Sequence, residues 1–119
     1  MKLLIELLTG DLQPEYKTTE SEIYAGEANL FRSGVSIGGK LFLTSERLIF
    51  LPHKFNFNKK IEYIELSEVN VFQSITSLNI LNNTLAFTLE NGTELIFIVN
   101  NIEIWMEEIE RAKKVVDLI

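Results

Sequence analysis

The stretch that decides the fold class is Gly38-Gly39-Lys40-Leu41-Phe42-Leu43-Thr44-Ser45-Glu46-Arg47-Leu48-Ile49-Phe50. It holds two short apolar runs, 40–44 and 47–51, on either side of a polar turn. Pro52 closes the second run, because proline cannot donate a backbone hydrogen bond to a neighbouring strand. Short apolar runs divided by turn residues are typical of antiparallel strands. The stretch therefore predicts a β-hairpin.

The pattern extends toward the N-terminus. Gly38-Gly39 is predicted to form a tight turn after a strand at 28–36, because glycine tolerates the backbone angles of such turns. The polar segment 17–22 is interpreted as a linker. Leucines at helical spacing within residues 1–16 predict a short amphipathic helix. We therefore divide the chain into an N-terminal extension, 1–21, and one domain, 22–119.

The pattern also extends toward the C-terminus. Apolar residues between 61 and 72 predict two strands around a turn at Ser67-Glu68. The runs 85–89 and 94–99 predict a further hairpin, and the Asn91-Gly92 pair between them favours a type I′ turn. Short strands at this regular spacing are typical of an antiparallel sandwich or a small barrel.

The final segment predicts an amphipathic helix. Its apolar residues recur at spacings of three and four and form one stripe: Ile102, Trp105, Ile109, Ala112, Val116 and Ile119. Asn100 or Asn101 is predicted to cap this helix through its side-chain amide. Trp105 is predicted to be the chief buried anchor, and a coiled-coil seam is the less favoured alternative because the run is short.

Composition indicates one ordinary globular domain. The chain has 119 residues, of which 46% are hydrophobic and 24% charged, and it has no cysteine. Disulfides and thiolate chemistry are therefore excluded, and a reducing cytoplasmic location is the simplest interpretation. No stretch approaches the roughly 20 apolar residues that a membrane-spanning helix needs. We expect a cytoplasmic protein, or one bound peripherally at the inner membrane surface.

Charge is unevenly distributed along the chain. The net charge is −6, which lowers the expectation of nucleic-acid binding. Segment 32–60 nevertheless carries six cations and one acid, Glu46, and so has an excess of five positive charges. We predict that the ligand-binding surface lies in this segment, with the candidate residues Arg32, Lys40, Arg47, His53, Lys54, Phe55, Phe57, Lys59 and Lys60.

As a set, these residues resemble a known family. Residues 38–50 are similar to the core of the GRAM domain, where a hydrophobic strand, a Thr-x-x-Arg turn and a second strand follow one another. Residues 26–31 resemble the first strand of that family. Residues 52–56 resemble the loop after the second hairpin in its small bacterial members, and residues 107–109 resemble part of the closing helix. The resemblance covers about residues 22–114.

The resemblance implies a mainly β fold: a pleckstrin-homology-like barrel of two orthogonal antiparallel sheets, capped by the C-terminal helix. Domains of this family bind membrane lipids, often phosphoinositides, or protein partners. The family has no catalytic residue set to transfer, and it implies no cofactor.

Individual residues give little support for catalysis. His53 is the single histidine, and no carboxylate lies between Leu48 and Lys60, so a metal or acid–base role is disfavoured. We predict no catalytic residue, no metal and no cofactor. Arg47 could bind phosphate through its guanidinium, but the favoured role is to anchor the turn or pair with Glu46, Glu62 or Glu65.

Phe55 and Phe57 alternate with lysines, as expected of rings inserted into a lipid interface beneath basic side chains. A strand edge with both rings in the core fits the same pattern and is favoured. Two functions stay open. The first is a non-catalytic module that contacts anionic lipid or an acidic protein through segment 32–60. The alternative is a protein-interaction or weak self-assembly domain that binds no lipid.

Overall fold

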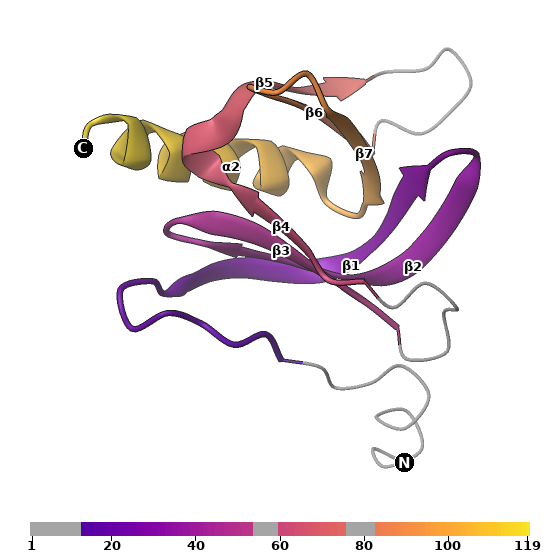
Figure 1. Cartoon of the computed structure of the whole chain (residues 1–119), viewed down its shortest axis with the longest axis horizontal. Coiled ribbons are helices and arrows are strands. Elements are labelled where there is room, and N and C mark those ends of the chain that lie inside the picture. The colour runs from indigo at the N-terminus through magenta and orange to yellow at the C-terminus, as the bar shows by residue number, and fades with distance from the viewer. Residues whose placement is uncertain (1–12, 54–59, 76–82) are drawn as a thin grey trace.

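The computed structural model describes residues 13–53, 60–75 and 83–119 and contains a β-sheet followed by a long helix (Figure 1). The strands are β1 (Glu22–Arg32), β2 (Val35–Thr44), β3 (Arg47–Pro52), β4 (Glu62–Glu65), β5 (Val69–Ile75), β6 (Thr84–Leu89) and β7 (Glu94–Val99). A 3₁₀ turn, η2 (Leu66–Glu68), joins β4 to β5, and helix α2 (Ile102–Asp117) follows β7. The predicted mainly β fold with a C-terminal helix is confirmed.

The seven strands form one antiparallel sheet in the order β4-β3-β2-β1-β7-β6-β5. Strand β1 pairs with β2 along almost its whole length, and its second half, Ala28–Phe31, also pairs with β7. The sheet curls around β1 into two layers (Figure 1). Its two edge strands, β4 and β5, follow one another in the chain and are joined by η2. This is the predicted barrel-like arrangement, with β1 shared by both layers.

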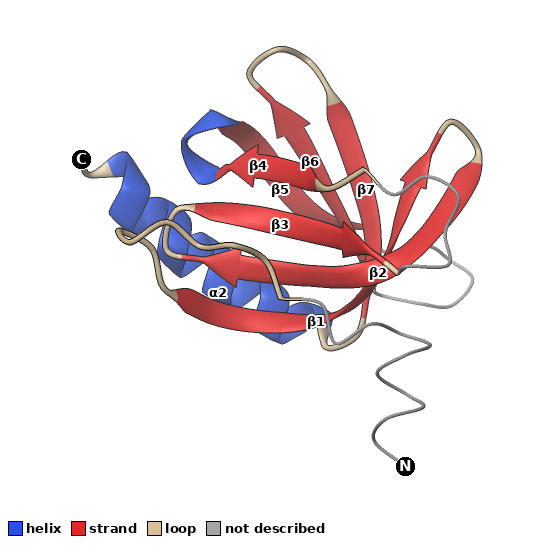
Figure 2. Ribbon diagram, turned by 60° about the horizontal axis from the view of Figure 1, so that its bottom comes forward, coloured by secondary structure: helices blue, strands red, loops and turns tan. Residues whose placement is uncertain are grey.

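The core fills the space between the two layers and helix α2. Inward side chains alternate along the strands, as the period of two requires, and Leu41, Leu43, Leu48 and Phe50 of one hairpin are fully buried. Figure 2 shows α2 lying across the sheet, where its apolar stripe meets the core. Trp105 is 1% exposed and stands edge-on to Tyr24, with 4.7 Å between ring centroids. The predicted anchor role of Trp105 is confirmed.

The start of α2 differs from the prediction. Asn101 holds the N-cap position in a left-handed conformation with φ 55°, and its side chain makes no capping hydrogen bond. Its backbone carbonyl accepts hydrogen bonds from the amides of Ile104 and Trp105, as the carbonyl of an N-cap residue does. The predicted side-chain cap is wrong for Asn101, because side-chain capping goes with an extended N-cap backbone and this residue is left-handed.

Two turn predictions are also wrong. Gly38 and Gly39 lie within β2, and the first hairpin turns at Ser33-Gly34, where both φ angles are positive, 52° and 77°. Positive angles at both positions define the type I′ turn. In the β6–β7 hairpin only Gly92, and not Asn91, has positive φ, so the type I′ prediction there fails.

Gly39 is required for packing within the sheet. A methyl group on it would lie 2.3 Å from the Leu51 carbonyl oxygen and 2.7 Å from the Phe50 ring. We expect Gly39→Ala to lower the free energy of unfolding by about 1–3 kcal/mol, because backbone and a core ring must move apart. Urea unfolding followed by circular dichroism measures this. Gly38→Ala is the matched control, since its nearest neighbour at 3.3 Å is the Asn29 side chain, and equal effects would contradict the argument.

The segments outside the central domain are only partly described. Most of the helix predicted within residues 1–16 falls outside the described residues, and residues 13–16 have no regular secondary structure. Of residues 17–22, interpreted as a linker, Glu22 begins β1, and Ser21 exchanges two hydrogen bonds with Ser45 of the β2–β3 turn. No helix in the described part of the chain is long and apolar enough to cross a membrane.

Candidate functional site

Arg47 anchors the turn between β2 and β3. Its guanidinium binds the Glu20 carboxylate, with Nη2 2.7 Å and Nε 3.0 Å from Oε1. Thr44 donates its hydroxyl to the same carboxylate at 2.6 Å and accepts from the Arg47 amide at 3.0 Å. The Glu20 side chain is fully buried and that of Arg47 is 13% exposed. Arg47 therefore has the structural role that the sequence favoured, but its carboxylate partner is Glu20 and not one of the three predicted glutamates.

Glu20 is held ionised by its neighbours. Burial alone would raise the pKa of its carboxyl group, but the hydrogen bonds from Arg47, Thr44 and the Lys17 amide outweigh it and lower the pKa to about 2. A phosphate ligand would have to displace this buried carboxylate from Arg47. Arg47 is therefore a poor candidate for ligand contact.

Arg32 spans the open end of the barrel beside the β1–β2 turn. Its Nη2 lies 2.5 Å from Oε1 of Glu62, on β4. Both residues face inward, because the buried Leu30 and Ile64 stand two positions away on the same strands. The ion pair thus closes the barrel core at this end. We call the surface formed by Phe31, Arg32, Val35, Ile61 and Glu62 the β1–β2 end.

The remaining candidate residues are dispersed. Lys40 lies on the outer face of β2, with its ammonium 5.2 Å from the centre of the Phe42 ring. His53 follows β3; its amide donates to the Gly38 carbonyl, and its Nε2 lies 3.1 Å from Glu27 Oε1, beside a pocket of about 280 Å³. Lys60 is exposed just before β4. The candidates Lys54, Phe55, Phe57 and Lys59 lie outside the described residues.

Three apolar side chains near the β1–β2 turn and at the start of β4 are exposed. Phe31, Val35 and Ile61 are exposed there, Val35 to 57%. Phe31 and Val35 belong to the first hairpin, and Ile61 precedes Glu62, whose bond to Arg32 brings β4 to this end. The exposed set therefore flanks both the β1–β2 turn and the residue at which the chain re-enters the sheet.

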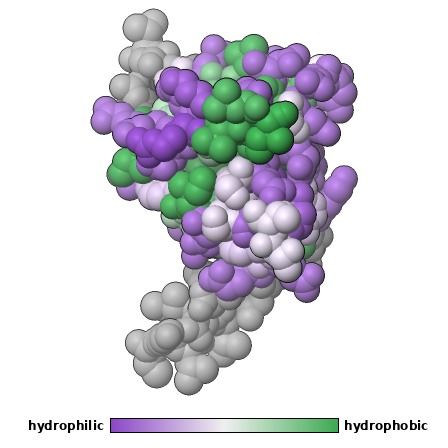
Figure 3. All heavy atoms as spheres, turned by 90° about the vertical axis from the view of Figure 1, so that its left-hand side faces the viewer, coloured by the Kyte–Doolittle hydropathy of each residue, from purple (hydrophilic) through white to green (hydrophobic). Residues whose placement is uncertain are grey.

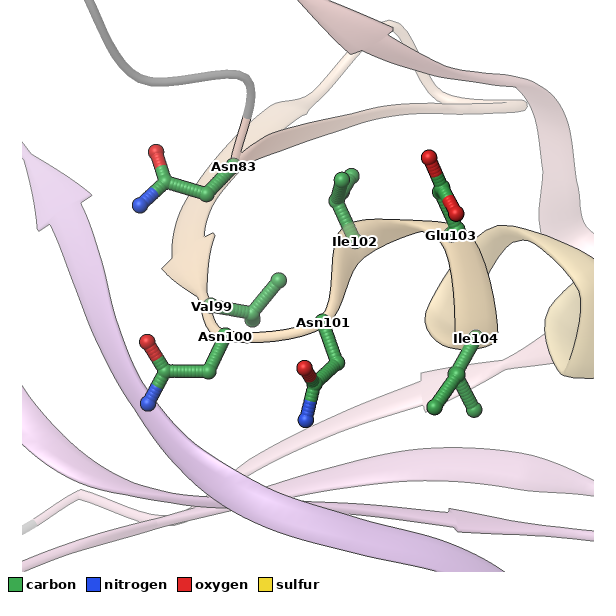
Figure 4. A pocket seen from close by; sticks show the side chains of 7 residues that line it. All are labelled: Asn83, Val99, Asn100, Asn101, Ile102, Glu103 and Ile104. Carbon is green, nitrogen blue, oxygen red and sulfur yellow. The ribbon is translucent and has the colours of Figure 1, made fainter.

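A polar pocket of about 350 Å³ lies where β7 passes into α2 (Figure 4). Asn83, Asn100 and Asn101 line it, and the amides of Asn83 and Asn100 lie on the side away from the helix. Asn83 Oδ1 is buried, with no hydrogen-bond partner among the described residues. This pocket can hydrogen-bond a ligand or water. It offers no acid–base pair, because Glu103 is the one titratable side chain among the described residues that line it.

Metal binding has no support in the described ranges, where no three carboxylate or histidine side chains come together.

No family model matches the chain, and no curated relative does. Solved structures do match. The Vps36 N-terminal PH domain is 16% identical, with a TM-score of 0.74, 94% of this chain covered and 92% of that chain.

Two further structures agree with this match. The C-terminal domain of an unknown protein from Leishmania infantum is 13% identical over 79% of this chain and 84% of its own, with a TM-score of 0.71. The Slm1-PH domain in complex with inositol-4-phosphate is 16% identical over 78% and 95%, with a TM-score of 0.57. This chain has a pleckstrin-homology-like fold. At these identities the likeness to the PH domains concerns the fold.

The PH-like barrel separates the predicted site residues into two groups. Arg47 lies at the β2–β3 turn, one end of the barrel, and Arg32 lies at the other. Sequence reasoning missed Glu20 and Glu62, the carboxylates that bind the two arginines. It also missed the exposed Phe31 and Val35, although the strand alternation at 28–36 would have placed Phe31 on the outer face.

Proposed function

We propose that this chain is a GRAM-like, non-catalytic binding module that attaches to anionic membrane surfaces through its β1–β2 end. The observation that supports this most is the exposure of Phe31, Val35 and Ile61, together with that of the basic residue Lys60, which precedes Ile61 in the chain. Apolar side chains that enter the lipid interface beneath cations are how peripheral proteins bind anionic bilayers. A site of action at the cytoplasmic face of a membrane follows from this proposal.

The sequence offers further candidates for membrane contact. Lys54, Phe55, Phe57 and Lys59 join His53 to Lys60 in the chain, and both of those flanking residues are described. Three lysines and two aromatic rings with no acid between 53 and 60 would strengthen attraction to anionic lipid. Arg32 and Arg47 contribute less, because both guanidinium groups already bind carboxylates.

The GRAM assignment is supported by the hairpin of residues 38–50. Thr44 and Arg47, the two fixed positions of the Thr-x-x-Arg turn, meet on one carboxylate. This explains physically why the turn needs those residue types. The same geometry supports a scaffold role for the motif, with the ligand bound elsewhere on the barrel.

Vesicle sedimentation tests the proposal. We expect binding to vesicles of phosphatidylcholine with phosphatidylserine or a phosphoinositide, weaker binding at higher salt, and none to phosphatidylcholine alone. Lys59→Glu with Lys60→Glu should weaken binding about tenfold or more, since each cation near an anionic surface contributes about 1 kcal/mol. Val35→Ser should weaken it further.

The matched control reverses the charge of two exposed cations on α2, Arg111→Glu with Lys114→Glu. Its vesicle affinity should stay within about twofold of that of the unmodified protein, because these cations lie far from the proposed surface and act only through the net charge. The membrane proposal is wrong if binding is absent, if it is insensitive to salt, or if both double variants lose it equally. Circular dichroism of each variant confirms that the fold is retained.

A further inference from the structure

A second surface lies at the other end of β2, where helix α2 ends. A groove of about 500 Å³ runs between the last turns of α2 and the sheet. Val115 and Val116 form its helix wall, and Glu46, Glu65 and Ser67 stand on the facing wall. We call it the α2 groove. Its position is independent of the surface assigned to membrane binding.

The helix wall is apolar beyond what the core requires. The buried stripe of α2 continues through Ala112 to Val116, which packs on the core. Val115 lies off that stripe and is 56% exposed, and Ile119, which also lines the groove, is fully exposed. Figure 3 looks at the side of the molecule on which α2 ends and shows hydrophobic residues gathered there among hydrophilic ones. Val115 and Ile119 thus present exposed apolar side chains to the groove.

The facing wall is acidic. Glu46 and Glu65 share one ammonium, that of Lys17, at 3.0 and 3.9 Å. Lys113, near this end of the helix, donates to the Leu66 carbonyl and the Asp117 carboxylate. The end of a helix adds negative partial charge through its last carbonyl groups. The groove is therefore apolar on one wall and negative on the other.

We propose that the α2 groove binds a basic, apolar segment of a partner protein. Leucine-like side chains would cover Val115 and Ile119, while lysine or arginine would meet Glu46 and Glu65, an amphipathic match of the kind seen for peptides in grooves. An anionic bilayer is disfavoured here by the same carboxylates. The partner has the opposite charge to the one that segment 32–60 predicts.

The test uses the whole chain, labelled with ¹⁵N, and three short probe peptides. The first alternates arginine with leucine, the second replaces arginine by glutamate, and the third replaces leucine by serine. We expect the first peptide to shift the amide resonances of Glu46, Glu65 and Val115, and the other two to leave them unmoved. Light scattering should show a monomer.

Variants make the test specific. Glu65→Lys should weaken the first peptide about tenfold or more and allow the glutamate peptide to bind, because like charges oppose association. Val115→Ser should also weaken it, while vesicle binding stays unchanged. Glu103→Lys, the same charge change in the first turn of α2, is the control.

Three results would overturn the proposal. One is equal binding of the glutamate peptide to the unmodified chain. Another is a set of shifts that maps away from the groove, or no shifts at all. The third is a dimer that Val115→Ser converts to a monomer, which would make a second copy of this chain the occupant.

Discussion

Trp105→Ala is expected to lower the free energy of unfolding by about 3–5 kcal/mol, the usual range for removing a large buried aromatic side chain. The indole is 1% exposed and lies edge-on to Tyr24. It also packs against Gly26, since a β-carbon on that residue would lie 3.5 Å from the indole ring. Its removal would leave a void between α2 and the first half of β1. Since a domain is stable by only about 5–15 kcal/mol, the variant should be close to unfolding at body temperature.

Urea titration followed by far-ultraviolet circular dichroism measures this effect, because the variant has no tryptophan to report by fluorescence. Ile104→Ala is the control on the neighbouring residue, which is exposed, and should change stability by about 1 kcal/mol or less. Similar losses in the two variants would show that α2 does not depend on the indole for its attachment to the barrel.

Glu20→Ala is expected to lower the free energy of unfolding by about 3 kcal/mol or more, because it leaves a nearly buried guanidinium without its counter-charge. Arg47 and the Thr44 hydroxyl both lose their acceptor. Lys17→Ala removes an exposed ion pair instead and should change stability by less than about 1 kcal/mol. If Glu20→Ala proves as mild as Lys17→Ala, the buried cluster does not hold the β2–β3 turn.

The same carboxylate makes stability depend on pH. Folding lowers the pKa of Glu20 from 4.5 to about 2, so the folded protein binds this proton less readily than the unfolded chain. The stabilisation is complete above about pH 4.5 and is lost as the pH falls toward 2; a shift of this size corresponds to about 3 kcal/mol. Stability curves of the protein and of Glu20→Gln should therefore converge across that interval. Parallel curves would contradict the assignment.

The strands could be predicted because their signals are local. Alternating apolar residues and polar turns placed β3, β6, β7 and α2 close to their observed bounds. The turn at Gly38-Gly39 was misplaced because Gly39 serves a close contact with β3, where the Phe50 ring and the Leu51 carbonyl leave no room for a side chain. A glycine kept for packing and a glycine kept for a turn look the same in one sequence.

The binding surface was harder to predict because charge was counted along the chain. Segment 32–60 has five excess positive charges by sequence, yet Arg32 and Arg47 meet carboxylates that lie about thirty residues away. No spacing rule brings Glu20 to Arg47, since the contact depends on how residues 17–21 cross the sheet. The exposed side chains of the β1–β2 end and the α2 groove likewise become visible only when distant segments meet.

The sharing of β1 between the two layers has a consequence for biosynthesis. Strands β1, β2 and β3 follow one another in the chain and can pair at once, but Ala28–Phe31 must wait for β7, which is made only after β2 to β6. Until then an apolar strand edge stays open to other nascent chains, and such edges promote aggregation. We expect slowed translation before residue 94 to increase the dependence of this protein on chaperones, whereas a pause after residue 99 should not.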